Sequence, residues 1–186
     1  MKFSFTRFKY YWGERVISKH LKKKSNRTMR SCNIEDAKSM GMLCEIRSKD
    51  DYNSLVEIID FLKKEYAITN LKILAFYPLK DEPFFLKSRL GLDFFTLENL
   101  NYYGLPNNSI VRNFMNETFD ILIDLTHKRI VPLRLVLLFS KSPFKVGSFS
   151  NEKKPFYDLM IETDPADYKE YVNQVTNYLK IFDKND

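Results

Sequence analysis

The polar residues best placed to do chemistry are Asp124, Thr126 and His127. They end or follow an apolar run, residues 119–125, that is typical of a central strand covered on both faces. In open α/β sheets, ligands bind beyond the carboxyl ends of the strands. Aspartate and histidine suit general acid–base work, although a strand-end aspartate also commonly caps the following turn. These three residues are our candidate site for a small-molecule ligand or for a transferase-like enzyme.

Signatures of nucleophilic catalysis and phosphate binding are missing from the sequence. It contains no GxSxG elbow, no GxxxxGK[ST] loop and no GxGxxG turn, and only 5 of its 186 residues are glycine. Cys32 and Cys44 have no CxxC or Cys/His companions, so we expect two reduced thiols, with Cys44 buried and inert. The acids near the C-terminus, including Asp164 and Asp167, are explained by a helix dipole without a metal. We therefore predict no catalytic residue, no cofactor and no metal.

Positive charge is concentrated at the N-terminus. Residues 1–30 carry ten basic side chains and one acid, Glu14, for a net charge of +9. The rest of the chain is −3, against a total of +6, so the basic character belongs to this arm. Cations neutralise phosphates, and aromatic rings stack on unpaired bases. We predict a non-enzymatic protein whose arm docks on structured RNA, with the ribosome as a candidate partner, through Arg7, Phe8, Lys9, Tyr11, Trp12, Arg15, Lys19, Lys22, Lys23, Lys24, Arg27 and Arg30.

Two other interpretations of the arm stay open. Basic and aromatic side chains also suit an anionic membrane surface, where rings enter the interface and lysines face the headgroups. Alternatively, the aromatic stripe packs on the rest of the chain and the lysines are solvated, which leaves room for a protein partner. The sequence has no apolar run of membrane-spanning length and no signal peptide, so we expect a cytoplasmic protein.

The alternation of apolar runs predicts the elements that hold these residues. We divide the chain into a basic aromatic arm, residues 1–31, and an α/β domain, residues 32–186. Strands are expected at 40–46, 71–77, 93–96, 119–125, 144–146 and 157–161. Helices are expected at 8–23, 50–66, 83–90, 109–116, 133–139 and from 164 onward, with Asp50 or Asp51, Thr96 and Asp164 as caps. This order predicts a single three-layer, mostly parallel, Rossmann-like sheet with a helical arm.

Five segments carry a resemblance to a known family. They read CNIEDAKSMG (32–41), LGLDFF (90–95), FDILIDL (119–125), FKVG (144–147) and YDLMI (157–161). Together they resemble an uncharacterised family of Bacteroidota proteins, which implies a cytoplasmic bacterial protein and no site residues. Residues 119–147 are also similar to part of the N-terminal, Rossmann-like half of heptosyltransferase-like enzymes. Because the chain lacks a Gly-rich first loop, that likeness implies the fold rather than glycosyl transfer.

Overall fold

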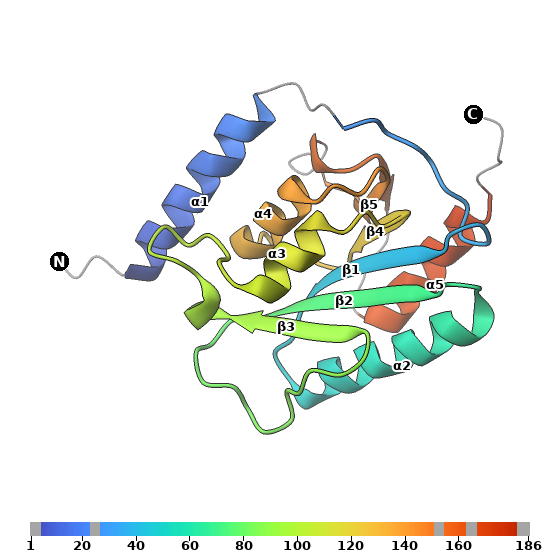
Figure 1. Ribbon diagram of the computed structural model, residues 1–186, viewed down its shortest axis with the longest axis horizontal. Helices are drawn as coiled ribbons and strands as arrows, with labels where there is room; N and C mark the ends of the chain where they lie inside the picture. Colours follow the sequence, from blue (N-terminus) through green and yellow to red (C-terminus); the bar gives the residue numbers. More distant parts are fainter. Residues whose placement is uncertain (1–4, 23–26, 151–154, 163–166, 182–186) are drawn as a thin grey trace.

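The computed structural model describes residues 5–22, 27–150, 155–162 and 167–181, which form an α/β fold (Figure 1). One six-stranded sheet runs in the order β3-β2-β1-β4-β5-β6. All neighbouring strands are parallel, which confirms the expected sheet. The strands are β1 (Ser39–Glu45), β2 (Asn70–Tyr77), β3 (Leu92–Thr96), β4 (Ile121–Asp124), β5 (Lys145–Ser148) and β6 (Leu159–Ile161).

Helices cover both faces of the sheet. On one side lie α2 (Lys49–Glu65) and α5 (Tyr168–Leu179), and on the other lie α3 (Ser109–Asn116) and α4 (Val131–Phe139) (Figure 1). A 3-10 turn, η1 (Leu97–Asn99), follows β3. The first helix, α1 (Phe5–Leu21), packs beside α4 on the α3/α4 side. The predicted arm is thus a helix docked against the rest of the chain.

Side chains alternate between the two faces of β1, as a strand covered on both sides requires. Met42 and Cys44 belong to the core under α2 and α5, whereas Leu43 belongs to the core under α3 and α4. All three are fully buried, which confirms the predicted burial of Cys44. Both cysteines are free thiols. β1 is therefore a central strand of the sheet, and the residues just after Glu45 lie in the middle of the row formed by the carboxyl ends of the strands.

The helix caps differ in part from those expected. Ser48, and not Asp50 or Asp51, caps α2, while the Asp51 side chain closes a capping box by accepting the Ser48 N–H. Asp167 caps α5, and Asp164 lies outside the described residues. Thr96 caps η1 as predicted. The capping box matters for the site because the Asp51 carboxylate occupies the amides of Arg47 and Ser48, just before the first residue of α2.

The helix expected at residues 83–90 does not form. Leu86 is buried, but Phe84 and Leu90 are 84% and 87% exposed, so the segment has no continuous apolar face to bury. Its end instead joins the sheet, since Arg89 and Leu92 exchange backbone hydrogen bonds of 3.0 and 2.9 Å. Gly91 makes this turn with a φ of +90°, which favours glycine. The prediction was wrong because the composition of the segment and a proline at its start do not show which of its side chains are buried in the core.

Candidate functional site

α1 is attached to α4 along one side. Ile17 is 1% exposed, and a Cβ on Gly13 would overlap Cγ1 of Val131 at the start of α4. His20 meets Phe139, at the end of α4, edge to face at 4.9 Å. The two helices therefore run in the same direction and touch closely. Glycine, which disfavours a helix in isolation, is used here because it permits that approach.

Glu14, the only acid in residues 1–30, completes the attachment. Its carboxylate accepts hydrogen bonds from Arg129 at 2.9 and 2.7 Å and from Arg134 at 2.6 Å. Burial acts to raise the pKa of Glu14, but hydrogen bonding to Arg129 and the charges of both arginines hold it below its ordinary value. Glu14 stays charged at neutral pH and fixes which side of α1 faces the rest of the chain.

The opposite side of α1 is exposed and cationic. It carries Tyr11, which is 58% exposed, together with Arg15, Lys19 and, directly after the last residue of α1, Lys22. We call these four residues the outer face of α1. They belong to the lining of an open groove of about 600 Å³. Arg15 lies 5.9 Å from the Tyr11 ring centroid and donates to the Tyr11 hydroxyl at 3.2 Å, so a cation and an aromatic ring are presented together.

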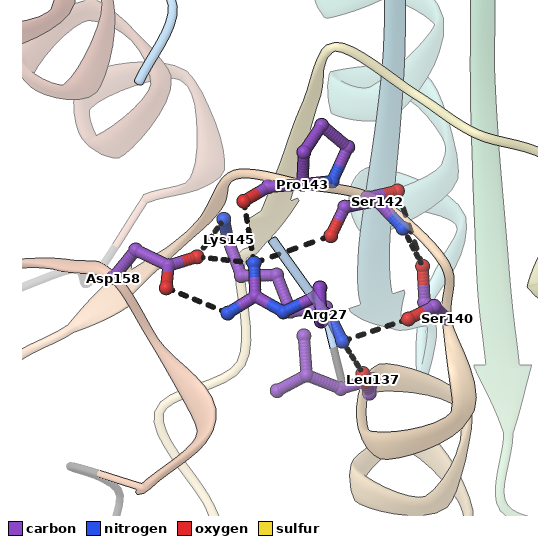
Figure 2. Close-up of polar contacts among 7 residues, drawn as sticks. All are labelled: Arg27, Leu137, Ser140, Ser142, Pro143, Lys145 and Asp158. Carbon is purple, nitrogen blue, oxygen red and sulfur yellow. Dashed lines mark hydrogen bonds and ion pairs between the residues drawn. The ribbon is translucent and has the colours of Figure 1, made fainter. Parts of the chain in front are cut away.

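Trp12 also lines this groove, with its ring centroid 5.8 Å from Arg15, whereas Arg27 does not line it and has structural contacts. The Trp12 ring packs edge to face on Tyr103 at 5.6 Å. Arg27 forms a two-nitrogen ion pair with Asp158, in which the Asp158 side chain is only 8% exposed (Figure 2). One Arg27 nitrogen also donates to the carbonyl of Pro143 at 2.5 Å. We therefore do not retain Arg27 as a phosphate contact.

The other residues predicted to contact RNA are Arg7, Phe8, Lys9, Lys23, Lys24 and Arg30. Arg30 is exposed, and its backbone N–H donates to the Pro143 carbonyl at 3.3 Å. Lys23 and Lys24 lie outside the described residues. The backbone of residues 7–9 belongs to α1, but the side chains of Arg7, Phe8 and Lys9 lie outside the described part.

A buried lysine lies beside the Arg27 ion pair. Lys145 is 4% exposed, and its ammonium donates to the carbonyls of Leu137 at 2.5 Å and Ser140 at 2.9 Å, at the end of α4 (Figure 2). Burial, followed by the charge of Arg27, lowers the pKa of Lys145 to about 8. Asp158 also accepts the backbone N–H of Lys145 at 2.8 Å. This network is a structural junction of α4, β5 and the segment after α1.

Asp124 organises the end of β4 from inside the protein. It is 2% exposed, accepts the Thr126 N–H at 2.8 Å, and accepts a hydrogen bond from the Tyr157 hydroxyl. Burial and the charge of Asp124 raise the pKa of Tyr157 well above its ordinary value, so Tyr157 remains a donor. The Tyr157 ring occupies the space where a Cβ of Gly147 would lie. Asp124 therefore holds the turn, the simpler of the two roles expected for it.

Thr126 and His127 line a cavity of about 350 Å³ beyond the ends of β1 and β4. Thr126 is 5% exposed, whereas His127 is exposed and its ring packs edge to face on Tyr171 at 5.8 Å. Sequence reasoning missed the rest of the lining, which comes from segments distant in the sequence. Because β1 and β4 are neighbours, the cavity is also lined by Glu45, Arg47, Asp50, Asp51, Ser54 and Tyr168.

α1 also reaches towards this end of the sheet. Burial raises the pKa of Tyr10, and the negative charge of Glu45 adds to that effect while Arg47 opposes it. Tyr10 on α1 therefore lies within electrostatic reach of the cavity lining. Among the described residues, no cluster of three or more His, Cys, Asp or Glu side chains could hold a metal ion.

The strand order and the cavity define the class: a doubly wound, all-parallel α/β protein with a hollow where the strand order reverses. The chain belongs to a family of unknown function, DUF6913, whose sequence model matches residues 9–182. That match includes most of α1. Neither the curated proteins nor the solved structures contain a match to this chain. No described helix has the length and apolar content needed to cross a membrane.

Proposed function

We propose that the protein binds structured RNA through the outer face of α1. The observation that carries this proposal is the attachment of the opposite side of the helix. Ile17, Gly13 and Glu14 hold α1 against α4, and this leaves three cations and a tyrosine directed outward. A binding surface that is already ordered loses less conformational entropy when it binds than a flexible tail would.

The spacing of the cations suits a phosphate backbone. Arg15 and Lys19 lie one turn apart on α1, and Lys22 follows its last residue at the spacing i+7, which puts the three cations on the same side over about 10 Å. Tyr11 lies one turn before Arg15 and adds an exposed ring, which can stack on an unpaired base. The charge supplies affinity without sequence preference, and the ring favours single-stranded or looped RNA over a uniform duplex.

The proposed setting is the cytoplasm of a bacterium, with ribosomal RNA as the target. The resemblance to a Bacteroidota family supports the bacterial setting, and the concentrated charge of residues 1–30 supports a large polyanion. An anionic membrane surface is the competing partner because it would attract the same cations. Binding measurements on RNA and on anionic vesicles separate the two partners.

The decisive variant neutralises the outer face without touching the attached side. Arg15→Gln, Lys19→Gln and Lys22→Gln together should weaken binding to purified ribosomal RNA by about tenfold or more at physiological salt. The slope of log affinity against log salt should fall by about two to three units, near one for each lost phosphate contact. A matched control, Lys63→Gln with Lys64→Gln and Lys87→Gln, removes the same charge from exposed lysines elsewhere and should bind as the unchanged protein does.

Equal weakening by the two triple variants would show a diffuse charge effect and would overturn the proposed surface. Binding to vesicles of anionic lipid, without binding to RNA, would assign the same surface to a membrane. Deleting residues 1–30 is a poorer test because it also removes Arg27. That deletion would leave the buried carboxylate of Asp158 without its ion-pair partner.

A further inference from the structure

The sheet of this protein has one point at which the strand order reverses. From β1 the chain continues outward to β2 and β3, and from β4 it continues outward to β5 and β6. Connections that leave two neighbouring strands in opposite directions open a crevice beyond their carboxyl ends, which is where doubly wound proteins bind ligands. The 350 Å³ cavity lies at this place and is large enough for a small molecule.

The position that would hold a phosphate is already filled. In dinucleotide sites, a Gly-rich turn and the first amides of the next helix hold the phosphates. Here the turn after β1 contains no glycine, and the Asp51 carboxylate accepts the N–H groups of Arg47 at 2.8 Å and Ser48 at 2.9 Å. Ser48 Oγ in turn accepts the Asp51 N–H at 3.1 Å. A phosphate at this helix start would meet the Asp51 carboxylate, which already accepts the amides of Arg47 and Ser48.

The charged residues that line the cavity are mainly acidic. Its four carboxylates outnumber its two permanent cations, Arg47 and Lys128, which gives a formal charge of −2 with His127 neutral. The Arg47 guanidinium donates two hydrogen bonds to Glu45, at 2.7 and 2.8 Å. The four carboxylates belong to Glu45, Asp50, Asp51 and Asp167.

The His127 wall of the cavity is backed by Tyr171, which does not itself line the cavity. The Tyr171 hydroxyl is fully buried and has no hydrogen-bond partner among the described residues. Its ring packs on the His127 ring, which is itself part of the cavity lining. An unsatisfied buried hydroxyl costs about 1–3 kcal/mol, so the wall behind His127 is less stable than full hydrogen bonding would make it.

We propose that this cavity binds a small amine-bearing molecule and not a nucleotide. The ammonium group lies against the exposed carboxylate of Asp50, and the ligand body packs on the buried floor formed by Thr126 and Ile130. This site is separate from the outer face of α1 and uses none of the residues proposed to bind RNA. Each proposal can therefore fail without the other.

The test uses the full chain and three matched probes. Putrescine supplies the amine, 1,4-butanediol has the same carbon chain without charge, and adenosine monophosphate supplies a nucleotide. In an NMR titration, putrescine should shift the backbone amide signals of Thr126 and His127 along a saturable curve, whereas the other two probes should not. Asp50→Asn should weaken the apparent affinity for putrescine by at least fivefold. Asp60→Asn, an exposed acid ten residues further along α2, should leave it unchanged.

Three results would overturn the proposal. Saturable binding of 1,4-butanediol with similar affinity would show that charge does not select the ligand, and saturable binding of adenosine monophosphate would contradict the filled phosphate position. Loss of putrescine binding in Asp60→Asn equal to that in Asp50→Asn would place the amine outside the cavity. The absence of any saturable response to the three probes would also count against the site.

Discussion

The side chains of Arg27 and Asp158, 131 positions apart in the sequence, face each other through two hydrogen bonds of 2.7 and 2.6 Å. The pair fastens the segment after α1 to the segment that precedes β6. Asp158 has a third donor in the Lys145 N–H, so its buried carboxylate is well satisfied while Arg27 is present. The position of the segment before β6 therefore depends on a residue that lies near the start of the chain.

Replacing Arg27 should destabilise the fold because it removes the partner of a buried charge. For Arg27→Ala we expect a loss of about 2–4 kcal/mol in the free energy of unfolding at pH 7, measured by urea denaturation. The control is Arg30→Ala, at an exposed position three residues away, which should change stability by less than about 0.5 kcal/mol. Equal stability of the two variants would show that the ion pair contributes little.

The lowered pKa of Lys145 predicts a rise of stability with pH. Between its folded pKa of about 8 and its ordinary value of 10.5, the unfolded chain binds the proton more strongly than the folded one. Raising the pH through this window therefore favours folding, by up to about 3 kcal/mol. The measurement is the difference in unfolding free energy between the unchanged protein and Lys145→Met from pH 7.5 to 9.5. A difference that stays flat with pH would contradict the prediction.

Gly13 provides a test of the α1–α4 contact in which helix propensity and packing oppose each other. Gly13→Leu improves the intrinsic helix propensity of α1 by somewhat under 1 kcal/mol, but its side chain overlaps Val131. We expect a net destabilisation of about 1–3 kcal/mol and faster proteolysis between α1 and β1. Ser18→Leu, on the exposed side of the same helix, should resist protease as the unchanged protein does. Similar proteolysis of the two variants would place Gly13 away from a close contact.

Removing the hydroxyl of Tyr157 and removing that of Tyr171 should have different effects on the stability of the protein. Tyr157→Phe takes away the donor to Asp124 and should cost about 1–3 kcal/mol, because it leaves a buried carboxylate oxygen without that partner. Tyr171→Phe removes a hydroxyl that has no partner among the described residues, so the free protein should be unchanged or more stable by about 1 kcal/mol. Melting temperatures of both variants, measured without added ligand, check this contrast. A large loss in Tyr171→Phe would mean that its hydroxyl is satisfied in solution.

The sequence predicted the helices and strands better than it predicted the tertiary contacts between them. Apolar runs located all six strands because most strand residues are buried, and Thr96 was recognised as a cap because its side chain bonds locally. The helix predicted at residues 83–90 was wrong because the conformation of this segment depends on tertiary contacts of Leu86 and Gly91, which no local sequence pattern encodes. For the same reason Glu14, which reads as one stray acid in a basic segment, gave no sign of its bonds to two arginines more than 110 positions away.

The candidate cavity was only half predictable. Thr126 and His127 were found because they follow the most apolar run of the chain, and strand ends are where open sheets bind ligands. Glu45 and Asp50 were missed because their proximity to His127 depends on β1 lying next to β4, a strand order that is not written in local composition. Asp124 was found but belongs to the interior, since alternation along a strand does not show which polar residue turns inward.

The position of α1 against α4 has a consequence for how the chain is made. The helix is synthesised more than 100 residues before α4, the segment on which it docks. Its apolar side therefore cannot be buried until α4 has been synthesised and the sheet has formed. Its main packing partner is that one helix. An element that is made early, docks late and is held mainly on one side can open locally without unfolding the sheet. Native-state hydrogen exchange should therefore be faster in α1 than in β1.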